Sequence, residues 1–238
     1  MKSFQSALRW ILGLSYFGIM FLVLILGIAL FDARKIYPFV RVLCNGLLRV
    51  MGLKIKGYGY DRFDSSKSYL YLGNHESLFD IFAIPATFPS YLVGVEAASH
   101  FKYPVWGYLA GKWGNIPITR RHLPEALKTL EKTAEVLNTG ANIIILPEGH
   151  RTLTGKMGSF KKGPFHLALA AKADILPFAF CGLYQFQNKL DWRVNPGTAE
   201  VKFGAPIAYE TYKNDSIDTL RKRVRLAIME LKQEAKNQ

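Results

Sequence analysis

The chain has 238 residues, and its 31 Lys and Arg side chains outnumber its 18 Asp and Glu side chains, which gives a formal net charge of +13. Half of the residues are hydrophobic, which excludes a disordered basic tail protein, because disorder requires few apolar residues together with high charge. The same abundance argues against a histone-like nucleic-acid binder. Two cysteines, Cys44 and Cys181, are too few for a disulfide framework or a metal cluster. The basic excess therefore requires an anionic partner, which is nucleic acid, an anionic membrane or a small phosphorylated ligand.

A long apolar segment lies near the N-terminus. Trp10–Phe31 is a run of 22 uncharged residues, and a helix of this length would reach about 33 Å, enough to cross the hydrocarbon core of a bilayer. A cleaved signal peptide is the alternative, because Lys2 and Arg9 form a basic start. However, the run exceeds the usual apolar region of a signal, and no small-residue cleavage site follows it. We therefore expect a retained anchor, which either spans the bilayer or enters it and returns.

The segment after this run has a different helical pattern. Within Ile36–Leu53, the polar residues Arg41, Asn45 and Arg49 form one narrow stripe. Such a helix can lie in the membrane interface with its basic stripe on lipid phosphates, or it can pack on the soluble domain, and both interpretations stay open. Residues 33–60 contain six basic side chains and no acidic one, which favours a cytoplasmic location for the rest of the chain.

Beyond residue 52, short β-rich runs alternate with helical patterns. The expected strands are Leu53–Tyr58, Tyr69–Gly73, Tyr91–Glu96, Asn115–Thr119, Asn142–Leu146, Ile175–Phe180 and Thr198–Phe203. The expected helices cover residues 123–137, 165–172 and 216–235. This alternation predicts an α/β domain with a central, largely parallel sheet flanked by helices. We therefore divide the chain into a membrane anchor with an interfacial helix, residues 1–52, and a soluble domain, residues 53–238.

The first candidate site follows the strand that ends at Gly73. His75 comes directly after it, and functional residues of parallel sheets gather beyond the carboxyl ends of strands. Because His75 and Asp80 lie about 140° apart on a straight helix, they can meet only if His75 sits in the turn and a helix begins near Ser77. Asp80 would then fix the imidazole tautomer and leave the other ring nitrogen as a general base. Ser77 and Asp80 also fit a capping box, in which Asp80 serves only the backbone, and the spacing leaves both interpretations open.

Two further strand ends carry charged side chains. Asn142–Leu146 runs into Pro-Glu-Gly, which forces a sharp turn and presents Glu148 and Arg151 at its end. An arginine there suits bidentate recognition of a phosphate, although a structural ion pair between these two residues is the alternative. Asn115–Thr119 is followed by Arg120, which by itself indicates only a basic turn.

The motifs occur in a characteristic order. They read His-x4-Asp, Gly-x-Ile-x-Ile-x-Arg and Pro-Glu-Gly-x-Arg, and Ile-Leu-Pro-Phe-Ala follows at residues 175–179. This set resembles the four sequence blocks of the glycerophospholipid acyltransferases, specifically the 1-acyl-glycerol-3-phosphate acyltransferases, over residues 50–210. A membrane-embedding N-terminal segment is also similar to that family.

The resemblance implies a role for each block. The histidine that matches His75 deprotonates the acceptor hydroxyl, and the aspartate that matches Asp80 orients it. The hydroxyl oxygen then attacks the thioester carbonyl of acyl-CoA or acyl-carrier protein, the co-substrate, without an acyl-enzyme. No metal and no cofactor is implied. The residues expected to hold the glycerol-phosphate head are Arg120, Glu148, Gly149 and Arg151.

The sequence therefore predicts a membrane-bound acyltransferase that converts lysophosphatidic acid to phosphatidic acid. Its expected partners are the phospholipid bilayer, lysophosphatidic acid and the acyl thioester, with no nucleic acid and with the catalytic domain on the cytoplasmic face. Pro117, Thr119 and His150 depart from the family's usual residues, which leaves glycerol-3-phosphate or another lysolipid open as the acceptor. A catalytically silent lipid-binding membrane protein is the alternative of another class, and the intact His75 and Asp80 argue against it.

Overall fold

The computed structural model describes residues 2–119 and 123–234, and within them seven strands form one sheet in the order β1-β7-β6-β2-β5-β3-β4. The strands are β1 (Leu53–Tyr58), β2 (Leu70–Gly73), β3 (Leu92–Ala97), β4 (Ile116–Ile118), β5 (Asn142–Ile145), β6 (Ile175–Cys181) and β7 (Gly197–Phe203). Each begins and ends within one residue of the strand that the sequence predicts. The strands from β6 to β4 are parallel, β7 is antiparallel to β6, and β1 is parallel to β7. The predicted α/β class with a largely parallel sheet is therefore confirmed.

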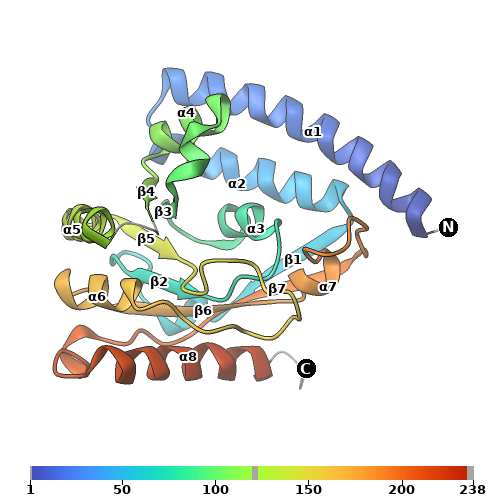
Figure 1. Ribbon diagram of the computed structural model, residues 1–238. Coiled ribbons are helices and arrows are strands. Elements are labelled where there is room, and N and C mark those ends of the chain that lie inside the picture. Colours follow the sequence, from blue (N-terminus) through green and yellow to red (C-terminus); the bar gives the residue numbers. More distant parts are fainter. Residues whose placement is uncertain (1, 120–122, 235–238) are drawn as a thin grey trace.

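Helices cover both faces of the sheet (Figure 1). They are α1 (Lys2–Leu30), α2 (Ala33–Val50), α3 (Asp80–Thr87), α4 (Pro104–Trp113), α5 (Leu123–Asn138), α6 (Gly163–Ala170), α7 (Leu183–Phe186) and α8 (Ile217–Glu234). Short 3₁₀ helices lie at Tyr60–Arg62, Ala98–Lys102 and Tyr209–Thr211. One apolar cluster joins α2 and α3 to the first face, and another joins α5, α6 and α8 to the second. α1 lies outside α2 as an additional layer, as Figure 1 shows.

The amphipathic pattern of α8 accounts for its place on the sheet. Leu220, Val224, Ile228 and Leu231 recur at helical spacing and are all buried. The hydroxyl of Ser216 accepts a hydrogen bond from the backbone N–H of Thr219 at 3.1 Å, which caps the helix start.

α2 packs on the sheet domain. Val40, Cys44 and Leu47 are buried in the same apolar cluster as residues of the sheet. Asn45, from the predicted polar stripe, donates a hydrogen bond to the backbone carbonyl of Ala86 at 3.0 Å. Of the two interpretations of this helix, packing on the domain is confirmed, and the division of the chain after residue 52 stays a prediction.

α1 is attached to the domain on one side only. Ser6 and the backbone of Val194 are joined by two hydrogen bonds of 3.3 and 3.2 Å, and the indole N–H of Trp10 donates to the carbonyl of Trp192 at 2.7 Å. By length and composition α1 can cross a membrane, and 17% of its most apolar stretch is buried. A helix in the core of a soluble protein would be mostly buried, so the outer side of α1 leaves an apolar face uncovered.

Three helices differ from the sequence-based expectation. α3 begins at Asp80 and not near Ser77, because a turn with a hydrogen bond from Asp80 N to Ser77 O, 3.4 Å, occupies the intervening residues. α4 and α7 are not predicted from the sequence. α7 has only four residues and no side-chain cap, so tertiary packing determines it. α4 begins with Pro104 and is followed by Gly114 in the left-handed region, and these are local start and stop signals.

Candidate active site

The turn after β2 carries the first candidate residues. β2 lies between β6 and β5 and is parallel to both, so the carboxyl ends of the three strands are neighbours. Asn74 locks the turn to β6, because its side chain accepts a hydrogen bond from Phe180 N at 2.7 Å and donates one to Phe180 O at 3.0 Å. At Gly73, a Cβ atom would lie 2.3 Å from the Phe178 ring. Only glycine fits there without displacing the ring, so the chain leaves the sheet along one defined path.

His75 and Asp80 are in contact. The Nδ1 atom of His75 lies 2.7 Å from Oδ2 of Asp80, and the imidazole is 25% exposed while Asp80 is 2% exposed. An N–H on Nδ1 that donates to this carboxylate leaves Nε2 with its lone pair. Nε2 has no hydrogen-bond partner among the described residues. The arrangement is that of an oriented general base which a substrate hydroxyl can reach.

Asp80 serves the backbone as well as His75. Its Oδ2 accepts a hydrogen bond from Glu76 N at 2.8 Å, and its Oδ1 accepts one from Ser77 N at 3.0 Å. The two interpretations of this carboxylate, capping the turn and orienting the imidazole, therefore both hold. Burial raises the pKa of Asp80, while the hydrogen bonds from His75 and from these two backbone N–H groups act in the opposite direction.

Ser77 is not placed as a nucleophile. Its side chain is fully buried, and its hydroxyl donates a hydrogen bond of 2.7 Å to the backbone carbonyl of Gln187. A hydroxyl that is buried and already bonded has neither access to a thioester nor a free base beside it. This fits the expectation that no acyl-enzyme forms.

Glu148 follows β5 and lies in the interior beside the His75 turn. One carboxylate oxygen accepts a hydrogen bond from the backbone N–H of His75 at 2.8 Å, and the other accepts one from Gly158 N at 2.6 Å. The residue is 1% exposed. Through these two hydrogen bonds the buried carboxylate holds the backbone at His75 and at Gly158 in place. Its expected contact with the glycerol-phosphate head stays a prediction.

Gly149 and Arg151 form the remainder of this turn. Gly149 has φ of 74° in the left-handed region and donates its N–H to Leu146 O at 3.0 Å, which explains the glycine. The backbone N–H of Thr152 donates to His75 O at 2.9 Å, so the Arg151 backbone runs directly beside the base. Arg151 is half-buried, and its guanidinium has no hydrogen bond or ion pair with any residue that the structure describes. The alternative of a Glu148–Arg151 ion pair is absent from this part of the structure.

Arg120, the fourth expected head-group residue, lies outside the described residues. β4, which precedes it, occupies the edge of the sheet and is parallel to β3. Its carboxyl end therefore faces the same side as that of β2, three strands away, or about 14 Å at the usual strand spacing.

Other contributors to the turn carry weaker sequence signals. Asn74 and Glu76 flank His75, and both are buried and bonded to α7 or β6. Polar residues next to a buried strand are a hint, but their partners are more than a hundred residues away in the chain. Sequence spacing alone therefore does not reveal them.

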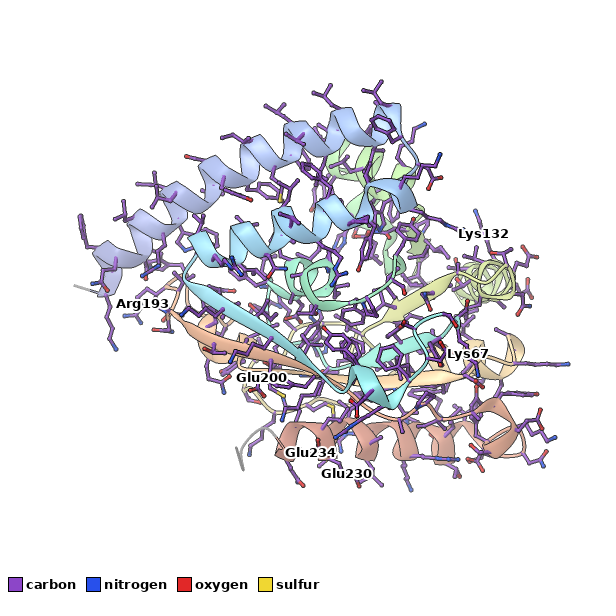
Figure 2. All side chains as sticks on the ribbon, turned by 180° about the vertical axis from the view of Figure 1, so that it is seen from behind. Lys67, Lys132, Arg193, Glu200, Glu230 and Glu234 are labelled. Atoms are coloured by element: carbon purple, nitrogen blue, oxygen red, sulfur yellow. The ribbon has the colours of Figure 1, made fainter. Side chains whose placement is uncertain are left out.

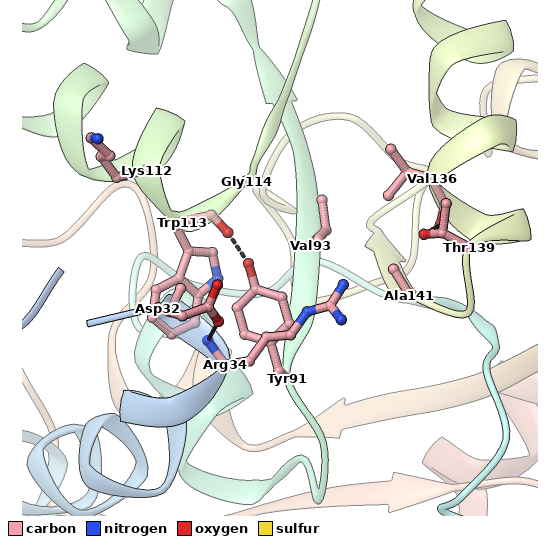
Figure 3. Close-up of a pocket in the computed structure, with 11 residues that line it drawn as sticks. Asp32, Arg34, Tyr91, Val93, Lys112, Trp113, Gly114, Val136, Thr139 and Ala141 are labelled. Atoms are coloured by element: carbon pink, nitrogen blue, oxygen red, sulfur yellow. Dashed lines mark hydrogen bonds between the residues drawn. The ribbon is translucent and has the colours of Figure 1, made fainter.

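A cavity lies away from this turn. It measures about 440 Å³ and opens between the start of α2, the amino end of β3 and the end of α4. Figure 3 shows the Tyr91 hydroxyl bonded to the Trp113 carbonyl and Arg34 beside the Tyr91 ring, whereas Lys112 points away. β3 runs parallel to β2, with β5 between them, so the amino end of β3 and the carboxyl end of β2 lie at opposite ends of the strands. This cavity is therefore separate from the candidate active site.

Comparison with known proteins identifies the class. The acyltransferase family model matches residues 54–181, more than half of the chain and the whole stretch from His75 to Arg151. The chain belongs to the acyltransferase family.

Individual relatives narrow the comparison. The chain is 27% identical over 195 residues to 1-acyl-sn-glycerol-3-phosphate acyltransferase alpha of Ovis aries, which covers 80% of this chain and 67% of the sheep protein. It is 31% identical over 155 residues to the 1-acyl-sn-glycerol-3-phosphate acyltransferase of Cocos nucifera, which covers 65% of this chain and 50% of the coconut protein. This chain thus spans between one half and about two thirds of these relatives.

A solved structure has the same fold over its full length. The crystal structure of the 1-acyl-sn-glycerophosphate (LPA) acyltransferase PlsC from Thermotoga maritima superposes with a TM-score of 0.85, covering 100% of this chain and 99% of that chain. At 19% sequence identity, the likeness establishes the fold, including the apolar N-terminal helix.

Proposed function

We propose that this protein is a membrane-bound acyltransferase that moves a fatty acyl group from an acyl thioester to the free hydroxyl of lysophosphatidic acid, giving phosphatidic acid. The observation that carries the proposal is the contact between His75 and Asp80, 2.7 Å, within the part of the chain that the family model matches. The names of the similar proteins from sheep and coconut support the acceptor.

The residues of the turn supply a complete proton path for this reaction. His75 Nε2 takes the proton of the acceptor hydroxyl while the hydroxyl oxygen bonds to the thioester carbonyl carbon. Asp80 stabilises the imidazolium that forms, through the contact at Nδ1. The carbon–sulfur bond then breaks, the acyl group stays on the acceptor oxygen, and the imidazolium returns its proton to the leaving thiolate. Holding hydroxyl and thioester side by side contributes much of the rate gain.

Arg151 is the described residue best suited to the acceptor phosphate. Its guanidinium is half-buried and has no anionic partner within the described residues, and a guanidinium matches a phosphate with two parallel hydrogen bonds. The hydrogen bond between Thr152 and His75 keeps the arginine's backbone beside the base. A phosphate held here would place a lysolipid hydroxyl near His75. We propose Arg120 and Gly149 as further parts of the same head-group site.

The uncovered face of α1 is the proposed membrane contact. Exposed apolar side chains line this helix and continue onto α2; they include Ile11, Leu14, Ile19, Leu22, Leu26, Phe39 and Val42. Figure 2 shows side chains made almost only of carbon along the outer edge of α1, while charged atoms gather on the far side around α8, where Glu230 and Glu234 are labelled.

The attachment of α1 to the domain constrains how it meets the bilayer. Its N-terminal end is tied to the segment around Val194 through Ser6, and its middle packs on the sheet domain through Met20. We infer that α1 lies along one side of the bilayer with the domain beneath it. Two exposed apolar side chains, Leu78 and Ile81, exposed by 48% and 38%, also lie within a few residues of His75 and Asp80 in the chain. A lysolipid can thus stay partly in the membrane while its hydroxyl reacts.

The decisive experiment offers the purified full-length protein a panel of acceptors in lipid vesicles. The panel contains lysophosphatidic acid, glycerol-3-phosphate and a phosphate-free monoacylglycerol, each with acyl-CoA and with acyl-carrier protein. We expect saturable transfer to lysophosphatidic acid, and the donor that supports it identifies the thioester. Faster transfer to another acceptor would reassign the substrate, and no transfer with any pair would favour a lipid-binding protein without catalysis.

A further inference from the structure

An ion pair with a buried carboxylate lies next to the candidate base in the same turn. The ammonium of Lys232, on the last turns of α8, contacts carboxylate oxygen Oε1 of Glu76, the residue that follows His75. The Glu76 side chain is 3% exposed and the Lys232 side chain 22% exposed. Lys232 also donates a hydrogen bond to Phe180 O at 3.2 Å.

Glu76 connects four parts of the fold at this point. Its Oε1 also accepts a hydrogen bond from Asn74 Nδ2 at 3.2 Å, and its Oε2 accepts one from the backbone N–H of Tyr184, at the start of α7, at 3.1 Å. The backbone N–H of the same residue donates to Asp80 Oδ2, the oxygen that contacts His75. A displacement of Glu76 therefore moves one of the hydrogen bonds that hold Asp80 against the imidazole.

α8 holds a second segment near the base in the same way. Arg221 donates a hydrogen bond to Phe160 O at 3.3 Å, and Arg225 donates one to Met157 O at 3.2 Å. Met157 and Phe160 flank Gly158, whose N–H is bonded to Glu148. Arg221, Arg225 and Lys232 lie at positions i, i+4 and i+11, so they share one side of the helix. The cations of α8 thus bind both the turn that contains Glu76 and the segment that contains Gly158. They do so from the side of the sheet opposite to α1 (Figure 1).

An exposed ion pair would contribute little at this position, but in this pair the carboxylate is buried and the ammonium side chain is only 22% exposed. Exposed pairs are screened by water, whereas removing one partner of a buried pair leaves an uncompensated charge that must move or take up a proton. In this fold the displaced carboxylate belongs to Glu76, the residue that follows the base, and the backbone N–H of Glu76 donates a hydrogen bond to the orienting carboxylate of Asp80.

We propose that the Lys232–Glu76 ion pair is a positioning element for His75 and Asp80, through which the C-terminal helix α8 sets the orientation of the base. Neither residue touches the reacting atoms, and both act through the turn. The proposal rests on the proposed function for its kinetic test, but its spectroscopic test does not depend on any substrate.

The experiment compares four variants of the full-length protein. Lys232→Met removes the cation, Lys232→Arg keeps it, and the double variant Glu76→Gln with Lys232→Met removes both charges without leaving one unpaired. Lys222→Met, an exposed lysine of the same helix, is the matched control. We expect kcat to fall about 10-fold to 100-fold in Lys232→Met, as a misplaced catalytic group does, with KM values for acceptor and donor nearly unchanged. Lys232→Arg retains most of kcat, and the control retains all of it.

The spectroscopic arm observes the hydrogen bond itself. In protein labelled with ¹⁵N-histidine, the Nδ1 proton of His75 gives a low-field resonance while it is bonded to Asp80. We expect this resonance to shift or disappear in Lys232→Met and in the double variant, and to persist in Lys232→Arg and Lys222→Met. If Lys232→Met does not fold, the double variant decides.

Wild-type kcat together with an unchanged resonance in a folded variant that lacks the pair would overturn the proposal. A wild-type protein that shows the resonance but transfers no acyl group would overturn the proposed function alone.

Discussion

The carboxylate of Glu148 is bonded to the backbone of His75, with Oε1 accepting the His75 N–H at 2.8 Å. The same side chain accepts the N–H of Gly158 at 2.6 Å, and Thr152 N donates to His75 O at 2.9 Å. Both backbone groups of the candidate base are thus held by the Pro-Glu-Gly-x-Arg turn. The motifs after β2 and β5 therefore act as one unit, although 73 residues separate Glu148 from His75.

This relationship predicts a kinetic effect for Glu148→Gln that differs from that of a substrate contact. A glutamine has one acceptor oxygen and one NH₂ group, so one of the two backbone N–H groups loses its partner. An unpaired buried donor costs about 1–3 kcal/mol of stability, and we expect kcat to fall while the KM for the acceptor changes little. Steady-state kinetics and thermal unfolding measure both. A raised acceptor KM with normal kcat would instead show that Glu148 binds the glycerol-phosphate head.

Removal of the base itself should abolish transfer without affecting the fold. His75→Ala leaves Asp80 with its two backbone partners, Glu76 and Ser77, so the turn keeps its hydrogen bonds. We expect a loss of acyl transfer on the order of 10²–10⁴-fold, the usual contribution of a general base. His166→Ala, an exposed histidine on α6, is the control. Activity of His75→Ala equal to that of this control would eliminate His75 as the base.

The positions of the strands could be predicted from the sequence because hydrophobic runs and turn residues are local signals. The contact between His75 and Asp80 was also within reach, since the five-residue spacing permits only a turn followed by a helix start. The start of α3 at Asp80 was not, because the turn before it contains Ser77, whose hydroxyl is bonded to the backbone carbonyl of Gln187, far along the chain.

The roles of Glu148 and Lys232 could not be predicted, because each side chain contacts residues that are distant in the sequence. Glu148 was expected to contact substrate, yet its two hydrogen bonds depend on how β5 and β2 lie side by side. Nothing in the helical pattern of α8 shows that one of its lysines, Lys232, reaches a buried carboxylate. Hydrogen bonds and ion pairs between residues distant in the chain depend on the tertiary fold, and the hydrophobic periodicity of a single sequence does not reveal them.

Arg151 should govern acceptor affinity. Arg151→Ala removes the guanidinium that follows the Pro-Glu-Gly turn. A charged hydrogen bond to phosphate contributes about 1.5–3 kcal/mol. We expect KM for lysophosphatidic acid to rise about 10-fold to 100-fold with little change in kcat. Arg151→Lys should recover part of this, because lysine lacks the planar fork.

The control for this prediction is Lys161→Ala, an exposed lysine after the same loop. With a monoacylglycerol acceptor, which has no phosphate, Arg151→Ala and wild type should have equal KM values. A defect of the same size for both acceptors would mean that Arg151 supports the loop and does not bind phosphate.

Cys181 should be unreactive in the folded protein. Burial raises the pKa of its thiol from 9.0 to about 12, with Lys232 opposing and Glu76 adding to the rise. Because the folded pKa lies above the unfolded one, the stabilisation from the neutral thiol is present below pH 9 and is lost as the pH rises towards 12. At pH 8 the thiolate fraction is about 1000-fold lower than in the unfolded chain. Alkylation by iodoacetamide, followed by mass spectrometry, should label Cys181 only in denaturant, and labelling at equal rates would contradict this.

The apolar face of α1 should determine membrane binding independently of catalysis. Leu14 and Leu22 are 59% and 64% exposed, so replacing both with Glu changes mainly the outer face of the helix. Each leucine that leaves an apolar environment loses about 1.5–3 kcal/mol, and a charge at that depth adds a further cost. We expect binding to phospholipid vesicles, measured by flotation, to fall at least about 10-fold. Leu226→Glu, an equally exposed leucine on α8 at 56%, is the matched control and should bind as wild type does. Equal loss in both variants would mean that charge in general, and not the α1 face, governs the attachment.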